Sequence, residues 1–233
     1  MNPLYEKLGK SREGIMSNEE RRCLLDEKVD VLLECPFSED VTSMSAEDFI
    51  RKILIEKIHA RYIVIGTDFH FGHDKRGDAK MLAEYAGVYG YELFVIEKEM
   101  YGEREISSSY VREELRKGNM EAVNDMLGYA YTVRGKVEHG RQLGRKLGFP
   151  TLNVHPSKDK LLPPNGVYLD SVRIDGIWYN GIGNVGFKPT VSDENRMLIE
   201  SNLLDYSGDA YGKEVEIQLY HFKRPEQKFE SIE

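Results

Sequence analysis

The sequence predicts an α/β half followed by a small β half. In the first half, short apolar segments alternate with amphipathic ones, a pattern typical of a parallel, doubly wound sheet. After Gly128, short strand-like segments are separated by Gly, Pro, Asn and Asp, which favours a small barrel or sandwich. We therefore predict a domain boundary near Gly128, with one domain over 1–128 and a second over 129–233.

The elements of the first half follow from local signals. Ser17 and Glu20 have the capping-box spacing and predict a helix that ends near Asp26. Ser45 and Asp48 open a second helix, because apolar residues follow them at helical spacing. Further helices are expected over 79–88, 108–117 and 119–127. A buried strand is expected over 29–35, and two more strands over 62–66 and 91–97.

The second half is read from alternation and turn residues. We expect strands over 131–137, 166–174, 177–183 and 214–222, each bounded by Gly, Pro, Asn or Asp. The stretch 195–204 is the one segment here whose pattern suits a helix.

Composition excludes several classes of protein. The chain has 32 Lys and Arg against 40 Asp and Glu, and a net charge of −8 argues against a general nucleic-acid binder. No apolar run is long enough to span a membrane, and the first residues lack the apolar core of a signal peptide. Cys23 and Cys35 do not make a disulfide framework, so we expect a protein of the reducing cytoplasm.

The segment GRQLGRKLGFPTLN, residues 140–153, combines features of an anion site and a metal site. Glycine-rich backbone cradles phosphate oxygens, and cations such as Arg145 suit an anionic ligand. Thr151 and Asn153 alternate across Leu152, so in an extended segment both side chains point the same way. Their oxygens are hard ligands for Mg²⁺, which indicates a metal–nucleotide site. The alternative is a basic surface turn that leads into a strand.

At this point the sequence resembles a known family. Five blocks fall in the order seen in riboflavin kinases: LGRKLGFPTLN (143–153), NGVYLDSV (165–172), GIGNVGFKPT (181–190), IESNLLDYSGDAYG (199–212) and RPEQKF (224–229). The first half resembles the adenylyltransferase module of the bacterial bifunctional riboflavin kinase/FAD synthetase, through IGTDFHFGHDKRGD (65–78) and ISSSYVR (106–112). The resemblance implies an incomplete nucleotidylyltransferase-type parallel sheet followed by a small riboflavin-kinase-like β-barrel.

For the second half, the resemblance implies transfer of the ATP γ-phosphate to riboflavin, which gives FMN. Such a transfer depends mainly on positioning and charge neutralisation. The resemblance makes Glu200 the general base and makes Thr151 and Asn153 the Mg²⁺ ligands. It also implies roles at the ATP phosphates for Gly140, Gly144 and Arg145, and in the flavin and nucleotide pockets for Asn184, Gly186, Thr190 and Arg224.

For the first half, the resemblance implies a second activity that joins FMN to ATP and releases FAD and pyrophosphate. Ser107 and Ser108 open a helix whose free N–H groups suit a phosphate, and Arg112 lies one turn further on. A Ser-capped surface helix is the alternative. Phe69 and Phe71 follow a strand, at the sheet edge where such folds bind ligands, and either stack near the flavin or adenine or belong to the core.

His70 and His73 spell the HxGH motif of nucleotidylyltransferases. The resemblance instead assigns them to a later block, GxDFxFG with a following Arg-Gly pair, which Arg76 and Gly77 supply. On that interpretation the first βα unit, with the true HxGH, is missing, and the chain also stops before a final helix.

Three hypotheses follow. The first is a riboflavin kinase that acts on the small molecules ATP, riboflavin and FMN. The second adds FAD synthesis and requires His70 and His73 to act as the HxGH. The third is a barrel that binds a nucleotide or RNA without catalysis, although the acidic balance argues against RNA.

Overall fold

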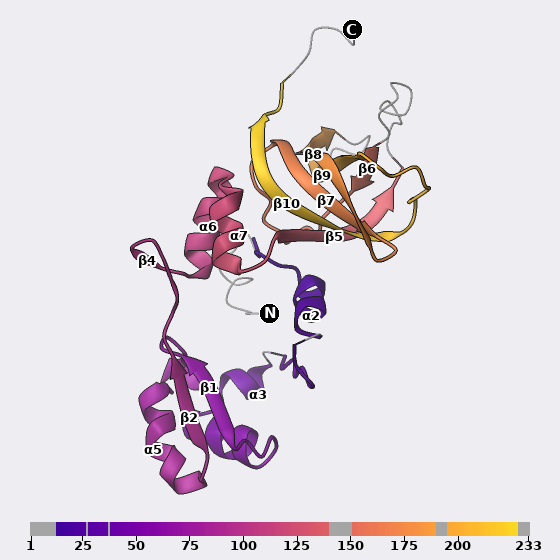
Figure 1. The fold of residues 1–233 in the computed structure, drawn as a ribbon. Helices are drawn as coiled ribbons and strands as arrows, with labels where there is room; N and C mark the ends of the chain where they lie inside the picture. The colour runs from indigo at the N-terminus through magenta and orange to yellow at the C-terminus, as the bar shows by residue number, and fades with distance from the viewer. Residues whose placement is uncertain (1–12, 27, 37, 140–150, 190–194, 228–233) are drawn as a thin grey trace, which may run out of the picture. The chain divides into compact units, whose positions relative to one another are not determined.

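A computed structural model describes residues 13–26, 28–36, 38–139, 151–189 and 195–227. Contacts divide the chain into two compact units, shown in Figure 1. The first unit is built around Leu33–Ile106, and the second joins Ser11–Leu32 to the chain from Ser107 onward. This division falls before the helices at 108–127, so the domain boundary near Gly128 stays a prediction. Within the described residues, no helix is both long and apolar enough to cross a membrane.

The first unit contains a two-stranded parallel sheet, as the strand–helix alternation predicts. Strands β1 (Tyr62–Gly66) and β2 (Glu92–Ile96) pair in parallel, and the crossover between them carries α5 (Ala79–Tyr89). Its other elements are α3 (Glu39–Thr42), α4 (Ala46–Asp48), the π-helix η1 (Phe49–Ile55), the 3₁₀ turn η2 (His73–Lys75), β3 (Met100–Tyr101) and β4 (Arg104–Glu105).

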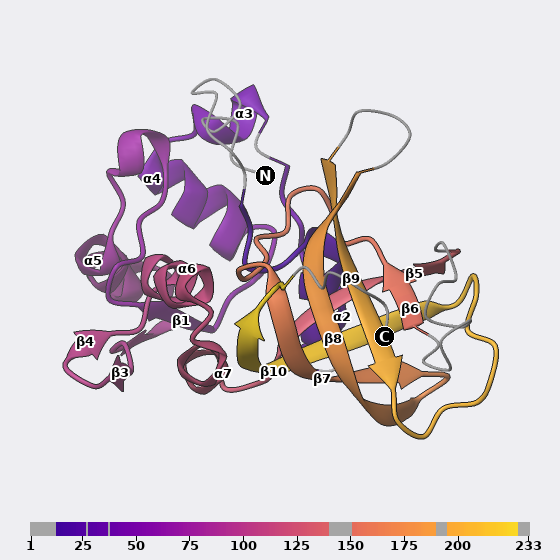
Figure 2. The same ribbon diagram turned by 90° about the horizontal axis from the view of Figure 1, so that it is seen from above.

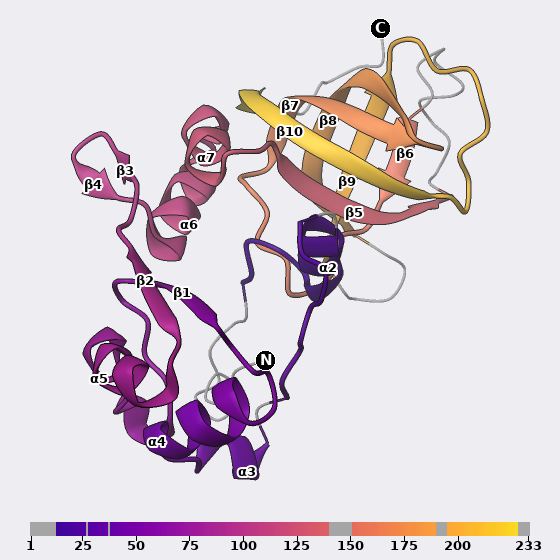
Figure 3. The ribbon, with the colours of Figure 1, turned by 60° about the horizontal axis from the view of Figure 1, so that its bottom comes forward.

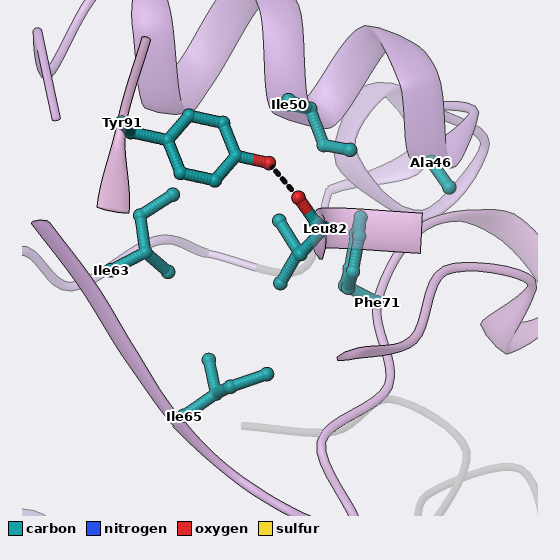
Figure 4. Packing of buried hydrophobic residues seen from close by; sticks show 7 residues of the cluster. All are labelled: Ala46, Ile50, Ile63, Ile65, Phe71, Leu82 and Tyr91. Atoms are coloured by element: carbon teal, nitrogen blue, oxygen red, sulfur yellow. Dashed lines mark hydrogen bonds between the residues drawn. The ribbon is translucent and has the colours of Figure 1, made fainter. Parts of the chain in front are cut away.

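The core of this unit lies between the helices and one face of the sheet (Figure 4). Ile50 and Leu82 are fully buried there, and the Tyr91 hydroxyl donates to the Leu82 carbonyl at 2.5 Å. The other buried members are Ala46, Ile63, Ile65 and Phe71. Alternation along β1 explains why Ile63 and Ile65 face this core while their neighbours are exposed.

The buried strand predicted over 29–35 is wrong. These residues form no strand, and Val31 and Leu33 are 72% and 68% exposed. An apolar run becomes a strand only where another strand offers its backbone N–H and C=O groups, and the described residues place none beside this run.

The second unit is a closed six-stranded barrel, in agreement with the predicted architecture (Figures 1 and 2). The strands follow the order β10-β5-β6-β9-β8-β7 around the barrel, and every neighbouring pair is antiparallel. Their bounds are Tyr131–Glu138 (β5), Thr151–Val154 (β6), Gly166–Ile174 (β7), Ile177–Pro189 (β8), Asn195–Leu203 (β9) and Glu214–Pro225 (β10).

The helix favoured over 195–204 is wrong, because this stretch is β9. In β9, Ile199 and Ser201 are fully buried and Leu203 is 8% exposed, a period of two that faces the barrel interior. Pairing with β6 on one side and β8 on the other stabilises the strand. Helical propensity is a weak preference that such tertiary contacts override.

In the described part of the second unit the helices are α2 (Asn18–Asp26), α6 (Ser108–Lys117) and α7 (Met120–Leu127). The capping box of α2 is confirmed, since Ser17 N donates to Glu20 Oε2 at 2.7 Å and Glu20 N donates to Ser17 Oγ at 3.1 Å. Gly118, with φ of 77°, ends α6 in the left-handed region that glycine adopts without strain.

Helix α2 lies beside β5 of the barrel (Figure 3), and a buried ion pair connects it to the residues between β6 and β7. The Lys160 ammonium lies 2.7 Å from the Glu20 carboxylate, and the two side chains are 2% and 6% exposed. The same carboxylate accepts from Arg134 N in β5, so α2 is bound to the barrel by more than apolar contact.

Candidate active site

Three polar residues line up across β6, β9 and β8. Asn153 on β6 is the register partner of Glu200 on β9, and Glu200 is the register partner of Asn184 on β8. Directly opposite residues in antiparallel strands project on the same face with Cβ atoms about 5 Å apart. We call Asn153, Glu200 and Asn184 the polar row. Thr151 lies two residues from Asn153 and therefore on the same face.

The polar row lies on the outer face of the barrel. The residues next to its members, Val154, Ile199 and Val185, are fully buried in the interior. Alternation then places the row itself outside. Asn153 is nevertheless only 6% exposed, while Glu200 and Asn184 are half-buried. A carboxylate beside two amides and a hydroxyl, partly withdrawn from water, can bind a cation and accept a proton from a bound hydroxyl.

Glu226 extends this site from the residues that follow β10. Its Oε1 accepts a hydrogen bond from Asn184 Nδ2 at 2.8 Å. A Cβ at Gly186 would lie 2.6 Å from the same oxygen, so the absence of a side chain there makes room for the carboxylate. Sequence reasoning missed Glu226, although it lies inside the RPEQKF block.

Arg224 lies at the same level of the barrel as Asn184, with one strand between them. It is the register partner of Val167, and Val167 in turn is the partner of Asn184. Arg224 on β10 and Asn184 on β8 are thus separated by the single strand β7. Four other candidates, Gly140, Gly144, Arg145 and Thr190, lie outside the described residues.

The candidates around α6 are placed at its first turn. Ser107 is the N-cap, and its Oγ accepts from Tyr110 N at 3.2 Å. Ser108 is the first residue of the helix. Arg112 Nε donates to the Glu13 carbonyl at 3.1 Å. The two Ser side chains therefore lie at a helix N-terminus as predicted, and the capping interaction gives one of them a structural role.

The aromatic candidates lie in the other compact unit. Phe71 is 7% exposed and belongs to the core, whereas Phe69 is 37% exposed and stacks on it with ring centroids 5.6 Å apart. Lys98 lies 2.8 Å from Asp68 in the same block and holds the pKa of that carboxyl below its usual value.

The two HxGH-like histidines are exposed and bond to nearby carbonyls. His70 Nδ1 lies 2.9 Å from the Asp68 carbonyl oxygen, and His73 Nδ1 lies 3.0 Å from that of Thr42. Each ring therefore has one nitrogen engaged with the backbone, which fixes its orientation.

Comparison with known proteins identifies the family of this chain. Residues 127–233 match the family model of riboflavin kinase, and residues 4–110 match that of FAD synthetase. The bifunctional riboflavin kinase/FMN adenylyltransferase of Listeria monocytogenes is 35% identical over 88% of this chain. The protein of the same name from Escherichia coli K12 is 33% identical over 92% of this chain. The chain spans 65% and 68% of the lengths of these two relatives. It belongs to the bifunctional riboflavin kinase/FMN adenylyltransferase family.

Further comparisons agree on the extent of the match. The family member from Pseudomonas fluorescens is 36% identical over 89% of this chain, which spans 66% of that relative. A crystal structure from Streptococcus pneumoniae, described as a macrolide-efflux protein, superposes with a TM-score of 0.83 and 30% identity. That superposition covers 94% of this chain and 71% of the other.

Family membership assigns each site to one half of the chain. The barrel and its polar row fall within the riboflavin kinase match, while β1, β2 and the Phe69 block fall within the FAD synthetase match. The hydroxyl, amide and carboxylate of Thr151, Asn153 and Glu200 make an oxygen-rich surface of the kind that suits a divalent cation.

Proposed function

We propose that this chain transfers the γ-phosphate of ATP to the terminal hydroxyl of riboflavin and so forms FMN. The observation that supports this most strongly is the polar row, in which register sets Glu200 between Asn153 and Asn184 inside the segment that matches riboflavin kinase. These residues come from three separate strands, so the fold, rather than local sequence, brings them together.

In this reaction Glu200 accepts the proton of the attacking hydroxyl. Its half-buried position limits competition from water, and the amides beside it hydrogen-bond and orient the hydroxyl chain. The side chains that would hold Mg²⁺ are those of Thr151 and Asn153 on the same face. When bound, Mg²⁺ neutralises charge on the phosphate oxygens. Glu226 accepts a hydrogen bond from the Asn184 side chain and so helps to fix the orientation of that amide.

The test is FMN formation from riboflavin, ATP and Mg²⁺, followed by chromatographic separation of the flavins. General-base catalysis contributes about 10²- to 10⁴-fold, so Glu200→Gln is expected to lower kcat by at least ~100-fold. Riboflavin binding, measured by fluorescence quenching, should change little because the substitution is nearly isosteric. The matched control is Glu214→Gln, an exposed carboxylate on β10. Undiminished FMN formation by Glu200→Gln would remove Glu200 from this role.

We also propose adenylylation of FMN to FAD as a second activity, because residues 4–110 match the FAD synthetase model. If His70 and His73 act as the HxGH, His73→Ala abolishes FAD formation and leaves FMN formation intact. His59→Ala, an exposed histidine of the same unit, is the control. Absence of FAD from folded protein that makes FMN would exclude this second activity.

A further inference from the structure

The barrel interior contains an acid that the proposed reaction does not use. Asp170 lies on β7 between Tyr168 and Val172, which are fully buried and face the interior. Asp170 shares their face because it alternates with them at a period of two. It is itself only 3% exposed, so its carboxyl group lies within the barrel.

Two glycines and a serine surround this carboxyl. A Cβ at Gly181 would lie 2.5 Å from Asp170 Oδ1, and a Cβ at Gly183 would lie 2.4 Å from Oδ2. The carboxyl therefore lies directly against the backbone of β8. Ser201 on β9 is fully buried and is the register partner of Gly183. Its Oγ would lie 2.8 Å from a Cβ added at Gly181.

The polar atoms of this cluster are not satisfied within the described part of the chain. Neither carboxyl oxygen of Asp170 nor the hydroxyl of Ser201 has a hydrogen-bond partner there. A buried ionised carboxylate without partners is costly, whereas the neutral acid is much less so.

Among the residues that the structure describes, the neighbours of Asp170 supply no compensating charge. β8 presents Gly181 and Gly183, β9 presents Ser201, and β10 presents the apolar Leu219 as register partner. On β7 the nearest titratable group on the same face is Tyr168. Burial raises the pKa of its hydroxyl above the usual value. Burial raises the pKa of Asp170 to about 7.

The strands that enclose Asp170 also carry the polar row. Gly183 immediately precedes Asn184, and Ser201 immediately follows Glu200. Asp170 thus contacts the inner face of the β8–β9 pair whose outer face holds two members of the row. A change in how closely β8 and β9 approach β7 moves Asn184 and Glu200 relative to their neighbours.

We propose that Asp170 is a pH-sensitive positioning residue: its neutral form fits between β7, β8 and β9, and loss of its proton loosens the β8–β9 pair that holds Asn184 and Glu200. The structural half of this proposal is independent of the enzyme's reaction. The effect on turnover rests on the proposed kinase function.

The sign of the stability effect follows from the direction of the shift. A carboxyl whose pKa is raised in the folded state holds its proton more tightly there than in the unfolded chain. Its contribution is fully present below about pH 4 and is lost as the pH rises through about 7. A rise of about three pKa units corresponds to a change of roughly 1000-fold in the unfolding equilibrium constant.

The experiment compares the full chain with Asp170→Asn and Asp170→Val from pH 5 to pH 8.5. Urea unfolding is followed by the fluorescence of Trp178, the one tryptophan of the chain, which lies on β8. Between pH 5 and pH 8.5 the unfolding constant of the wild type is expected to rise about 100-fold relative to both variants, because the rest of the 1000-fold change falls below pH 5. Two variants are used because the amide of Asn keeps a buried polar group, whereas Val removes it.

Amide hydrogen exchange gives the local readout. Exchange from β8 and β9, corrected for the intrinsic effect of pH, should accelerate between pH 6 and pH 8 in the wild type and not in Asp170→Val. The β1–β2 pair, which belongs to the other compact unit, is the internal control. Identical pH profiles of stability and exchange in wild type and variants would overturn the proposal. If those profiles differ but kcat does not follow them, only the link to turnover fails.

Discussion

Replacing Lys160 with Met tests how the buried ion pair stabilises the barrel unit. The ammonium donates to Glu20 Oε2 at 2.7 Å, the Ile15 carbonyl at 2.8 Å and the Thr132 carbonyl at 2.6 Å. All three of its donors are thus used. Methionine has a similar length but no donor, so it fills the space and leaves three acceptors without this partner.

The magnitude follows from those contacts. Removing one partner of a buried ion pair costs about 3–5 kcal/mol. The Glu20 carboxylate keeps its bonds from Ser17 N and Arg134 N, so we expect the lower end, about 3 kcal/mol. With a urea m-value near 2 kcal/mol/M, the unfolding midpoint should fall by roughly 1.5 M.

The assay is again the fluorescence of Trp178 in urea, which reports on the barrel unit. The matched control is Lys158→Met, an exposed lysine two residues away, for which a change within about 0.5 kcal/mol is expected. The double variant Glu20→Gln/Lys160→Met should recover part of the loss because it removes the unpaired charge. A midpoint for Lys160→Met within ~0.3 M of wild type would refute this account of the pair.

Two further predictions concern the same unit. Asn124→Ala removes the bonds from Asn124 Nδ2 to the Leu219 carbonyl at 3.0 Å and from Tyr131 N to Asn124 Oδ1 at 2.7 Å, so it should cost about 1–3 kcal/mol in urea unfolding. An unchanged midpoint would show that α7 is held without them. Gly183→Ala places a Cβ 2.4 Å from Asp170 Oδ2, and should destabilise the barrel by about 1–3 kcal/mol. Calorimetry of Gly183→Ala in an Asp170→Ala background should show a smaller loss; an equal loss would mean that this contact is not its cause.

Local signals in the sequence predict the helices well. The capping box of α2 and the N-caps Ser45 and Ser107 are set by residues three apart, so a short window contains both partners. Strands depend on distant partners, which explains the two errors. The run 29–35 has strand-like composition but no pairing among the described residues, and 195–203 has mixed composition but two neighbouring strands.

The site was predictable in its parts and not in its arrangement. The resemblance selects Asn153, Asn184 and Glu200 separately, and only the register of β6, β9 and β8 makes them neighbours. Glu226 and Asp170 were missed for a different reason. Each lies where glycines leave room for a carboxylate, and that room is a property of the folded barrel.

The ion pair between Glu20 and Lys160 joins residues 140 positions apart, and the whole Leu33–Ile106 unit lies between them in the chain. At about 5–20 residues per second, Lys160 is synthesised roughly 7–28 s after Glu20. During that interval the Glu20 carboxylate lacks its partner Lys160, while every described strand of the first unit is synthesised. Folding of that unit shortens the loop that must close, and each halving of loop length saves only about 0.6 kcal/mol. The order of synthesis therefore favours a first unit that forms early and a helix α2 that completes its contacts only after β5 and Lys160 have emerged.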